Sequence, residues 1–197
     1  MPDKWYFQDF YSYLSLQIKE KDMINYFIVP GLGGSGPDHW QTWFEKSNSN
    51  FQRIEQSDWN NPDIRKWAAN IDKAIEGYNP DSVVLVAHSL GCLAVAEWSA
   101  CYNRKIKAAL LVAPPDAELL QEKLQKTLFE QIPLKKLNFE TVLVASTNDP
   151  WASIAKAEDY AKNWGSKFIN IGAAGHVNNL SGHYRWEQGL EILQTLG

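Results

Sequence analysis

The segment 81–100 limits the folds open to this chain more than any other segment. It opens with VVLVA at 83–87, an apolar and largely β-branched run that predicts a strand buried on both faces. From Leu90 onward, apolar residues recur at helical spacing among good helix formers, so a helix is expected to follow directly. Ser89 lies in the short turn between the two. A sharp strand-to-helix turn of this kind holds a serine hydroxyl clear of the sheet and beside a helix N-terminus, which is typical of a nucleophile elbow.

Small residues are needed two positions before and two positions after such a serine, because strand and helix nearly touch there. The usual elbow has glycine at both positions, whereas this chain has Ala87 and Gly91. One additional methyl group is a mild departure. The alternative interpretation is an ordinary strand–helix junction in which Ser89 is the helix N-cap. The motif alone does not separate the two interpretations, so the rest of the chain must.

Composition favours one globular domain and argues against several partners. A chain of 197 residues with 45% hydrophobic and 21% charged residues is long enough to bury a full core. The net charge of −4 argues against nucleic acid or an anionic membrane as a partner, and no apolar run has the length of a membrane span. Cys92 and Cys101 stand on the predicted helix, about 13 Å apart along its axis, which is too far for a disulfide. These features favour a cytoplasmic location.

Residues 1–22 form an N-terminal extension before the first clear strand. Apolar residues at helical spacing predict an amphipathic helix there, and the absence of a small-residue cleavage site argues against a signal peptide. Two interpretations stay open. The segment is either an extra helix packed on the domain or an upstream extension, since Met23 directly precedes the first strand. Residues 23–197 are expected to form a single domain.

Strand-like and helix-like segments alternate along these residues. Besides 83–87, the expected strands are 24–29, 51–55, 106–113, 141–146 and 167–171. Besides the helix from Leu90, the expected helices are 38–46 (capped by Asp38), 61–78, 117–129, 153–164 and 184–196. This alternation predicts an α/β fold of three layers, with about six mostly parallel strands and helices on both faces. The interval 114–140 has room for one helix and its connections, so no large cap domain is expected.

Residues that follow the strands of a parallel sheet gather at its carboxyl edge. Here they are a glycine-rich loop at 31–37, then Ser89, Asp116, Asp149 and His176. The order Ser, Asp, His is that of α/β-hydrolase triads. A serine hydroxyl needs a neutral imidazole to take its proton, and a carboxylate must hold that imidazole in one tautomer. We therefore predict Ser89, Asp149 and His176 as catalytic residues, with Asp116 as the alternative acid.

Further site residues follow from position. The loop after the first strand and the residue after the nucleophile each donate one oxyanion N–H, which predicts Leu32 and Leu90. Residues expected to line the substrate pocket are Gly31, Trp40, Trp59 and Trp151. The histidine before the nucleophile, His88, is expected to point elsewhere and be structural, while His39 and His183 shape the site or the surface. No metal-ligand spacing and no nucleotide-binding GK[ST] ending occur, so neither a metal nor a cofactor is expected.

From Met23 to the end, the chain resembles the small serine-hydrolase family of bacterial YdeN-type proteins and animal retinoblastoma-binding-protein-9-like hydrolases. The matching segments are VPGLGGSGPDHWQTWFE (29–45), DWNNPDIRKW (58–67), VVLVAHSLGCLAVAEW (83–98), LLVAPPDAE (110–118), ASTNDPW (145–151) and GHVNNLSG (175–182). The resemblance implies a compact α/β-hydrolase core of six mostly parallel strands without a large cap. It also implies Ser89 as nucleophile, Asp149 as acid and His176 as base. Ala87 is the main departure in the core, and residues 1–22 have no counterpart.

The expected function is a cofactor-free serine hydrolase acting on small-molecule esters, or amides, of small acyl groups. One alternative is a protein-interaction module with incidental catalysis, since the animal relatives are named for a partner that recognises LxCxE. The segment LGCLA at 90–94 lacks the final Glu and is expected to be buried, which weakens this alternative. A cofactor-free peroxidase using the same three residues stays open. The oligomeric state is not predicted.

Overall fold

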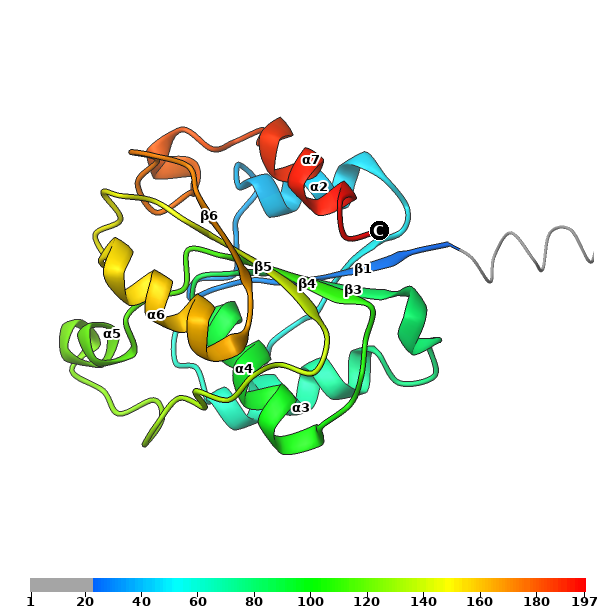
Figure 1. The fold of residues 1–197 in the computed structure, drawn as a ribbon, viewed down its shortest axis with the longest axis horizontal. Coiled ribbons are helices and arrows are strands. Elements are labelled where there is room, and N and C mark those ends of the chain that lie inside the picture. Colours follow the sequence, from blue (N-terminus) through cyan, green and yellow to red (C-terminus); the bar gives the residue numbers. More distant parts are fainter. Residues whose placement is uncertain (1–22) are drawn as a thin grey trace, which may run out of the picture.

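The computed structural model describes residues 23–197, and the helix expected within 1–22 lies outside the described residues. Six parallel strands form one sheet in the order β2-β1-β3-β4-β5-β6 (Figure 1). The strands are β1 (Asn25–Val29), β2 (Phe51–Arg53), β3 (Val83–His88), β4 (Ala108–Val112), β5 (Glu140–Ala145) and β6 (Lys167–Asn170). The predicted α/β-hydrolase-like architecture is therefore confirmed.

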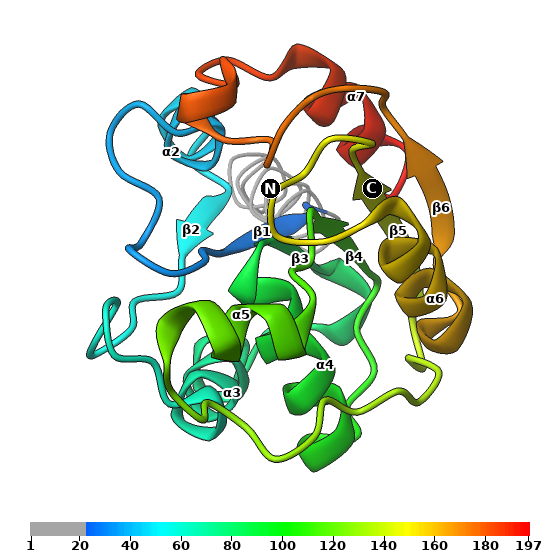
Figure 2. The ribbon, with the colours of Figure 1, turned by 90° about the vertical axis from the view of Figure 1, so that its left-hand side faces the viewer.

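Helices cover both faces of this sheet (Figures 1 and 2). One face carries α2 (Trp40–Ser47) and α7 (Glu187–Gln194), and the other carries α3 (Ile64–Ala74), α4 (Leu90–Tyr102) and α6 (Ile154–Trp164). The short helix α5 (Ala117–Leu124) lies at the carboxyl ends of the strands, which face the viewer in Figure 2. Two 3-10 turns, η1 (Pro80–Ser82) and η2 (Asn179–Ser181), complete the elements.

The central strands are apolar on both sides because both sides are covered. Every residue of β3 and β4 is buried. Along β3, Val84 and Val86 pack in the cluster under α2 and α7, whereas Leu85 and Ala87 pack in the cluster under α3 and α4. Full burial of each larger side chain stabilises the fold by about 1.5–3 kcal/mol. This two-sided packing fixes the end of β3, where Ser89 follows.

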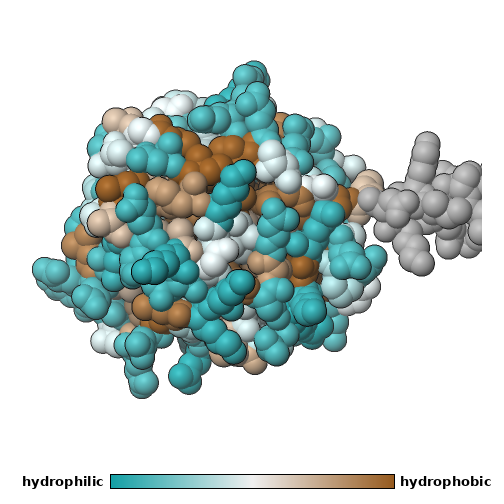
Figure 3. Space-filling view, viewed as in Figure 1, coloured by the Kyte–Doolittle hydropathy of each residue, from teal (hydrophilic) through white to brown (hydrophobic). Residues whose placement is uncertain are grey.

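The edge strand β6 is less covered than the centre. Phe168 and Ile169 are only partly buried, while Lys167 and Asn170 are exposed. Figure 3 shows hydrophobic surface along this edge, interrupted by hydrophilic side chains. No helix within residues 23–197 is long and apolar enough to cross a membrane.

Several predicted helix boundaries were wrong, and the helix expected at 61–78 spans only Ile64–Ala74. The helix expected at 38–46 with Asp38 as cap begins at Trp40, because His39 is the N-cap and its Nδ1 accepts the Gln41 N–H at 3.1 Å. The helix expected at 117–129 ends at Leu124, where Gln125 takes a left-handed conformation with φ of 51°. The helix expected at 184–196 begins only at Glu187. Between β4 and β5 the chain forms no helix other than α5, and no cap domain rises there.

Candidate active site

Ser89 occupies a strained turn between β3 and α4. Its φ of 53° and ψ of −126° are unusual for a residue with a side chain, and such conformations cost about 1–3 kcal/mol. Its N–H donates to the carbonyl of Val112 at 2.9 Å, which ties the turn to β4. Ser89 stands at the N-cap position of α4, but its side chain makes no capping hydrogen bond, which argues against the interpretation as an ordinary N-cap.

The tight contact predicted around this turn is present. A Cβ on Gly91 would collide with the backbone carbonyl of Val29, so only glycine fits where α4 passes β1. Ala87, the departure from the usual motif, is fully buried on the α3/α4 side of the sheet, where its methyl group packs in the core. The additional methyl is therefore accommodated within the packing between the sheet and these helices.

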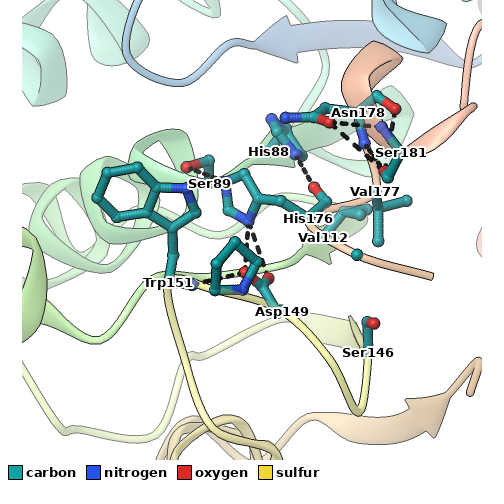
Figure 4. Close-up of polar contacts among 12 residues, drawn as sticks. His88, Ser89, Val112, Ser146, Asp149, Trp151, His176, Val177, Asn178 and Ser181 are labelled. Carbon is teal, nitrogen blue, oxygen red and sulfur yellow. Dashed lines mark hydrogen bonds and ion pairs between the residues drawn. The ribbon is translucent and has the colours of Figure 1, made fainter. Parts of the chain in front are cut away.

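Ser89, His176 and Asp149 lie in one hydrogen-bonded row (Figure 4). The Ser89 hydroxyl is 2.9 Å from His176 Nε2, and His176 Nδ1 is 3.0 and 2.8 Å from the two carboxylate oxygens of Asp149. A carboxylate only accepts hydrogen bonds, so Nδ1 carries the proton and Nε2 is free to accept the serine proton. Asp149 also accepts the Trp151 backbone N–H at 2.8 Å, which orients its carboxylate.

The segment 172–178, here called the histidine loop, is held by uncharged groups. His88 Nε2 donates to the carbonyl of His176 at 2.9 Å, and Trp40 Nε1 donates to the carbonyl of Val177 at 2.8 Å. On the other side, Asn148 Oδ1 accepts the Gly175 N–H at 2.7 Å. Val177 itself has a left-handed φ of 47°. These bonds fix the backbone on both sides of the imidazole.

The segment 31–36, here called the glycine loop, passes close beside Ser89. A Cβ on Gly31 would lie 2.8 Å from the Cβ of Ser89 and 3.4 Å from the nitrogen of Leu90, so glycine is required for this approach. The N–H groups of Leu32 and Leu90 therefore lie in the same neighbourhood. Within residues 23–197 neither N–H has a hydrogen-bond acceptor. Two donors without acceptors beside a serine hydroxyl suit an oxyanion.

A partly buried arginine holds the glycine loop in place. Arg53 Nη1 donates to the carbonyls of Gly34 and Ser35 at 2.9 and 3.2 Å, while its other nitrogens pair with Glu45 at 2.8 and 3.0 Å. Its side chain is only 11% exposed. Gln41 adds a third contact, since its side chain accepts from the Ser35 hydroxyl at 2.6 Å. The sequence did not point to Arg53, because a charged residue in the short strand expected at 51–55 is typical of an exposed position.

Two further histidines lie beside His176 in the interior. The ring of His88 is tilted against that of His176 with centroids 5.0 Å apart, and His39 packs edge-on against His88 at 4.7 Å. Burial holds the pKa of His88 well below its usual range. Burial, and to a lesser extent the charge of Arg53, lowers the pKa of His39 to about 3. Both rings are therefore neutral at neutral pH.

A cleft of about 340 Å³ opens at Ser89, a size that suits a small organic ligand. It is lined by Leu32, Gly33, Ser35, Gly36, His39, His88, Ser89, Leu120, Trp151, His176, Asn178, Asn179 and Leu180. Sequence reasoning did not select Leu120, Asn178, Asn179 or Leu180. The last three stand in GHVNNLSG, one of the segments that matched the family. A second hollow, of about 380 Å³, lies between the start of α3 and residues 127–131 and contains none of the three residues of the row.

Of the three tryptophans expected at the pocket, only Trp151 lines the cleft. Trp40 is fully buried, because the first residue of α2 faces the sheet and packs against Phe44 and Trp186. Trp59 lies behind the glycine loop, where its ring blocks any Cβ on Gly34. Gly31 lies close against Ser89 and is not part of the cleft wall.

The alternative acid, Asp116, has another structural place. It is the N-cap of α5, and its Oδ1 accepts the Glu118 N–H at 3.0 Å. Lys156 lies 3.8 Å from the same carboxylate. Of the two aspartates, only Asp149 contacts His176. Among residues 23–197, no three His, Cys, Asp or Glu side chains group closely enough to hold a metal ion.

Comparisons with known proteins show the family and the fold. The family model described as serine hydrolase matches residues 26–195. A protein described as a YdeN-like hydrolase from Pectobacterium atrosepticum is 30% identical, with a TM-score of 0.79 over 92% of this chain and 95% of that one. The ydeN gene product of B. subtilis is 17% identical, with a TM-score of 0.73 over 88% of this chain and 98% of its own.

More distant likeness extends across the fold. BpoC from Mycobacterium tuberculosis is 11% identical, with a TM-score of 0.62 over 88% of this chain and 93% of its own, which shows a shared fold alone. Curated protein sequences give no significant match. Since the family model covers nearly all of the sheet and its helices, the chain belongs to the serine hydrolase family and has the α/β-hydrolase fold.

Proposed function

We propose that this protein hydrolyses carboxylic esters, and amides, of small acyl groups with Ser89 as nucleophile, His176 as general base and Asp149 as the orienting acid. The observation that carries the proposal is the hydrogen-bonded row at 2.8–3.0 Å, in which Ser89 stands on a strained strand-to-helix turn and lines a cleft together with His176. Each contact has the direction that the chemistry needs. The Ser89 hydroxyl donates to a nitrogen whose partner nitrogen is held by a carboxylate.

The reaction follows from this arrangement in two halves. As Ser89 Oγ attacks the acyl carbon, its proton passes to His176 Nε2, and the carbonyl oxygen becomes an oxyanion facing the N–H groups of Leu32 and Leu90. His176 then gives that proton to the departing alkoxide or amine, which leaves an acyl-serine. Water, deprotonated by His176, attacks the acyl carbon and releases the acid, and Ser89 Oγ regains its proton.

The dimensions of the cleft favour short acyl groups. Trp151 and Leu120 form its apolar wall, and no inserted domain between β4 and β5 extends that wall. A short wall buries only a few methylenes, each stabilising binding by about 0.8 kcal/mol. Acetyl and butyryl esters are therefore expected to have higher kcat/KM than octanoyl esters. Trp151→Ala should widen the accepted chain length.

A fluorophosphonate probe and p-nitrophenyl esters test the proposal together. The wild-type chain should be labelled and should hydrolyse p-nitrophenyl acetate, and Ser89→Ala should lose both. The matched control is Ser47→Ala, which removes an exposed hydroxyl at the end of α2, away from the cleft. Turnover without labelling at Ser89 would contradict the proposal, and a folded wild-type chain with neither property would favour an interaction module.

A further inference from the structure

The two walls of the cleft differ in chemistry. On the side of α5 and the loop that follows β5, the wall is made of Leu120 and Trp151. On the side of α2 and η2, the polar residues are Ser35, His39, Asn178 and Asn179, and the exposed Leu180 of η2 is the apolar residue among them. No lining residue is an aspartate, glutamate, lysine or arginine. The cleft therefore offers an apolar surface on one side and uncharged polar groups on the other.

His39 is the most informative group on the polar side. The residue is only 5% exposed, and its Nδ1 accepts the Gln41 N–H at 3.1 Å. A neutral imidazole that accepts at Nδ1 carries its proton on Nε2, so Nε2–H is a donor. Nε2 is buried and has no hydrogen-bond partner among residues 23–197. Leaving a buried donor unpaired is unfavourable, and native proteins keep few such groups.

The neighbouring amides are also left to act as donors. Asn178 Oδ1 is occupied, because it accepts the Ser181 N–H at 3.2 Å in the capping box of η2. That bond turns the side chain so that its NH₂ group remains without an acceptor among the described residues. The Asn179 side chain likewise makes no hydrogen bond within residues 23–197. The polar wall is thus richer in N–H groups than in free acceptors.

The chemistry indicates which part of a substrate meets this wall. His176 Nε2 must pass its proton to the leaving oxygen, so the leaving group lies on the histidine side of the scissile carbon. The chain continues from His176 through Val177 to Asn178 and Asn179, and the ring of His88 lies between those of His176 and His39. An acyl group pointing the opposite way, toward α5, meets Leu120, while the Trp151 ring, with its centroid 6.2 Å from that of His176, lies where the two walls meet.

We propose that this site selects esters whose leaving alcohol carries further uncharged oxygen acceptors, such as a polyol, and that His39 Nε2–H is the main selecting group. The inference rests on the proposed function, since it assigns the two walls by the direction of proton transfer. Free N–H groups match hydroxyl, ether or carbonyl oxygens. An anionic alcohol has no matching cation in the wall.

Two butyrate esters of equal shape test this selection. In 2,3-dihydroxypropyl butyrate the alcohol carries two hydroxyls, and in 2-methylbutyl butyrate a methyl group replaces each hydroxyl. Wild-type kcat/KM, measured by pH-stat, should favour the dihydroxypropyl ester by about tenfold or more, because buried donors left unpaired penalise the apolar alcohol. His39→Asn should lower that ratio by about tenfold, mainly through KM. Asparagine keeps the N-cap of α2, and a thermal melt checks the fold.

Asn179→Ala, on the exposed side of the same wall, should lower the ratio by a smaller factor, while Ser47→Ala should leave it unchanged. Hydrolysis of p-nitrophenyl acetate by the wild type and by Ser89→Ala separates the proposed hydrolysis from the proposed selection of the alcohol. If that ester is cleaved through Ser89 but the wild-type ratio is near one, or folded His39→Asn keeps the wild-type ratio, the selection is overturned while the hydrolase remains. If no Ser89-dependent cleavage occurs, the proposed function fails and the selection fails with it.

Discussion

The glycine loop (31–36) and the histidine loop (172–178) meet at Ser89 from two sides and contribute different things. The histidine loop brings one side chain, the imidazole of His176, within 2.9 Å of the serine hydroxyl. The glycine loop brings a backbone N–H, that of Leu32, and needs Gly31 because a Cβ there would approach Ser89 to 2.8 Å. One loop therefore depends on a particular side chain, and the other depends on the path of its backbone.

The anchors of the two loops differ as well. The glycine loop is tied to β2 and α2 through Arg53 and its partner Glu45, a charged pair at 2.8 Å. The histidine loop is tied by neutral donors, His88 and Trp40, and by the amide of Asn148. It follows that the contribution of the histidine loop to the site, the imidazole of His176, is lost when that one residue is changed. A backbone contribution is lost only when its N–H or its anchors are removed.

The largest expected effect concerns the carboxylate behind the imidazole. Asp149→Asn should lower kcat on p-nitrophenyl acetate by about 10⁴-fold, because an amide no longer holds His176 in the tautomer that accepts the serine proton. The matched control is Asp116→Asn, which changes the other aspartate that follows a strand and keeps the cap of α5. Its effect should be small. Equal losses in the two variants, or a greater loss at Asp116, would contradict the assignment.

The sequence predicted the residues of the hydrogen-bonded row because their side chains carry the chemistry and each directly follows a strand. Ser89, Asp149 and His176 needed only the alternation of strands and helices and the order of residue types. The same reasoning found the six strands, whose apolar runs reflect burial between two helix layers. A local sequence pattern is sufficient to predict these features because burial and strand order, which the pattern reflects, determine them.

The remaining features depend on contacts between distant segments. Trp40 was expected at the pocket, but the side that the first residue of α2 faces is set by packing against Trp186. The cap of α2 shifted by one residue, since both Asp38 and His39 can accept a backbone N–H. Arg53 could not be selected, because its role arises from carbonyls 18 and 19 residues away in the chain. Non-local pairing leaves no periodic signal in a single sequence.

The second prediction separates backbone from side chain in the glycine loop. Leu32→Pro removes the N–H that faces the oxyanion and should lower kcat by about 10²–10³-fold, the usual effect of losing one such donor. Leu32→Ala keeps the N–H and should lose less than tenfold, through a looser cleft wall. Stopped-flow or steady-state kinetics on p-nitrophenyl acetate, with circular dichroism to check the fold, measures both. Equal effects would show that the Leu32 side chain, rather than its N–H, matters.

The smallest expected effect is on stability and concerns the buried histidines that support the histidine loop. The pKa of His39 is lowered by burial to about 3, below the value of about 6.5 expected in the unfolded chain. Between these values the unfolded chain binds a proton that the folded chain does not, so the free energy of unfolding falls as the pH falls. The contribution of His39 to the free energy of unfolding is retained above pH 6.5. Between pH 7 and pH 5, protonation of this residue in the unfolded chain lowers the free energy of unfolding by about 2 kcal/mol. His88, whose pKa is also lowered by burial, adds to this loss.

Urea unfolding of the wild type, His39→Asn and His183→Asn at pH 7 and pH 5 isolates this contribution. The quantity compared is the change in unfolding free energy between the two pH values, which removes any pH-independent cost of each substitution. His39→Asn should lose about 2 kcal/mol less than the wild type on acidification. His183 is only partly buried, and its pKa is lowered less, so its variant should stay close to the wild type. An acid loss in His39→Asn equal to that of the wild type would mean that His39 accepts a proton without cost in the folded chain. The buried neutral histidines His39 and His88 would then not be the acid-sensitive support that distinguishes the histidine loop from the arginine-anchored glycine loop.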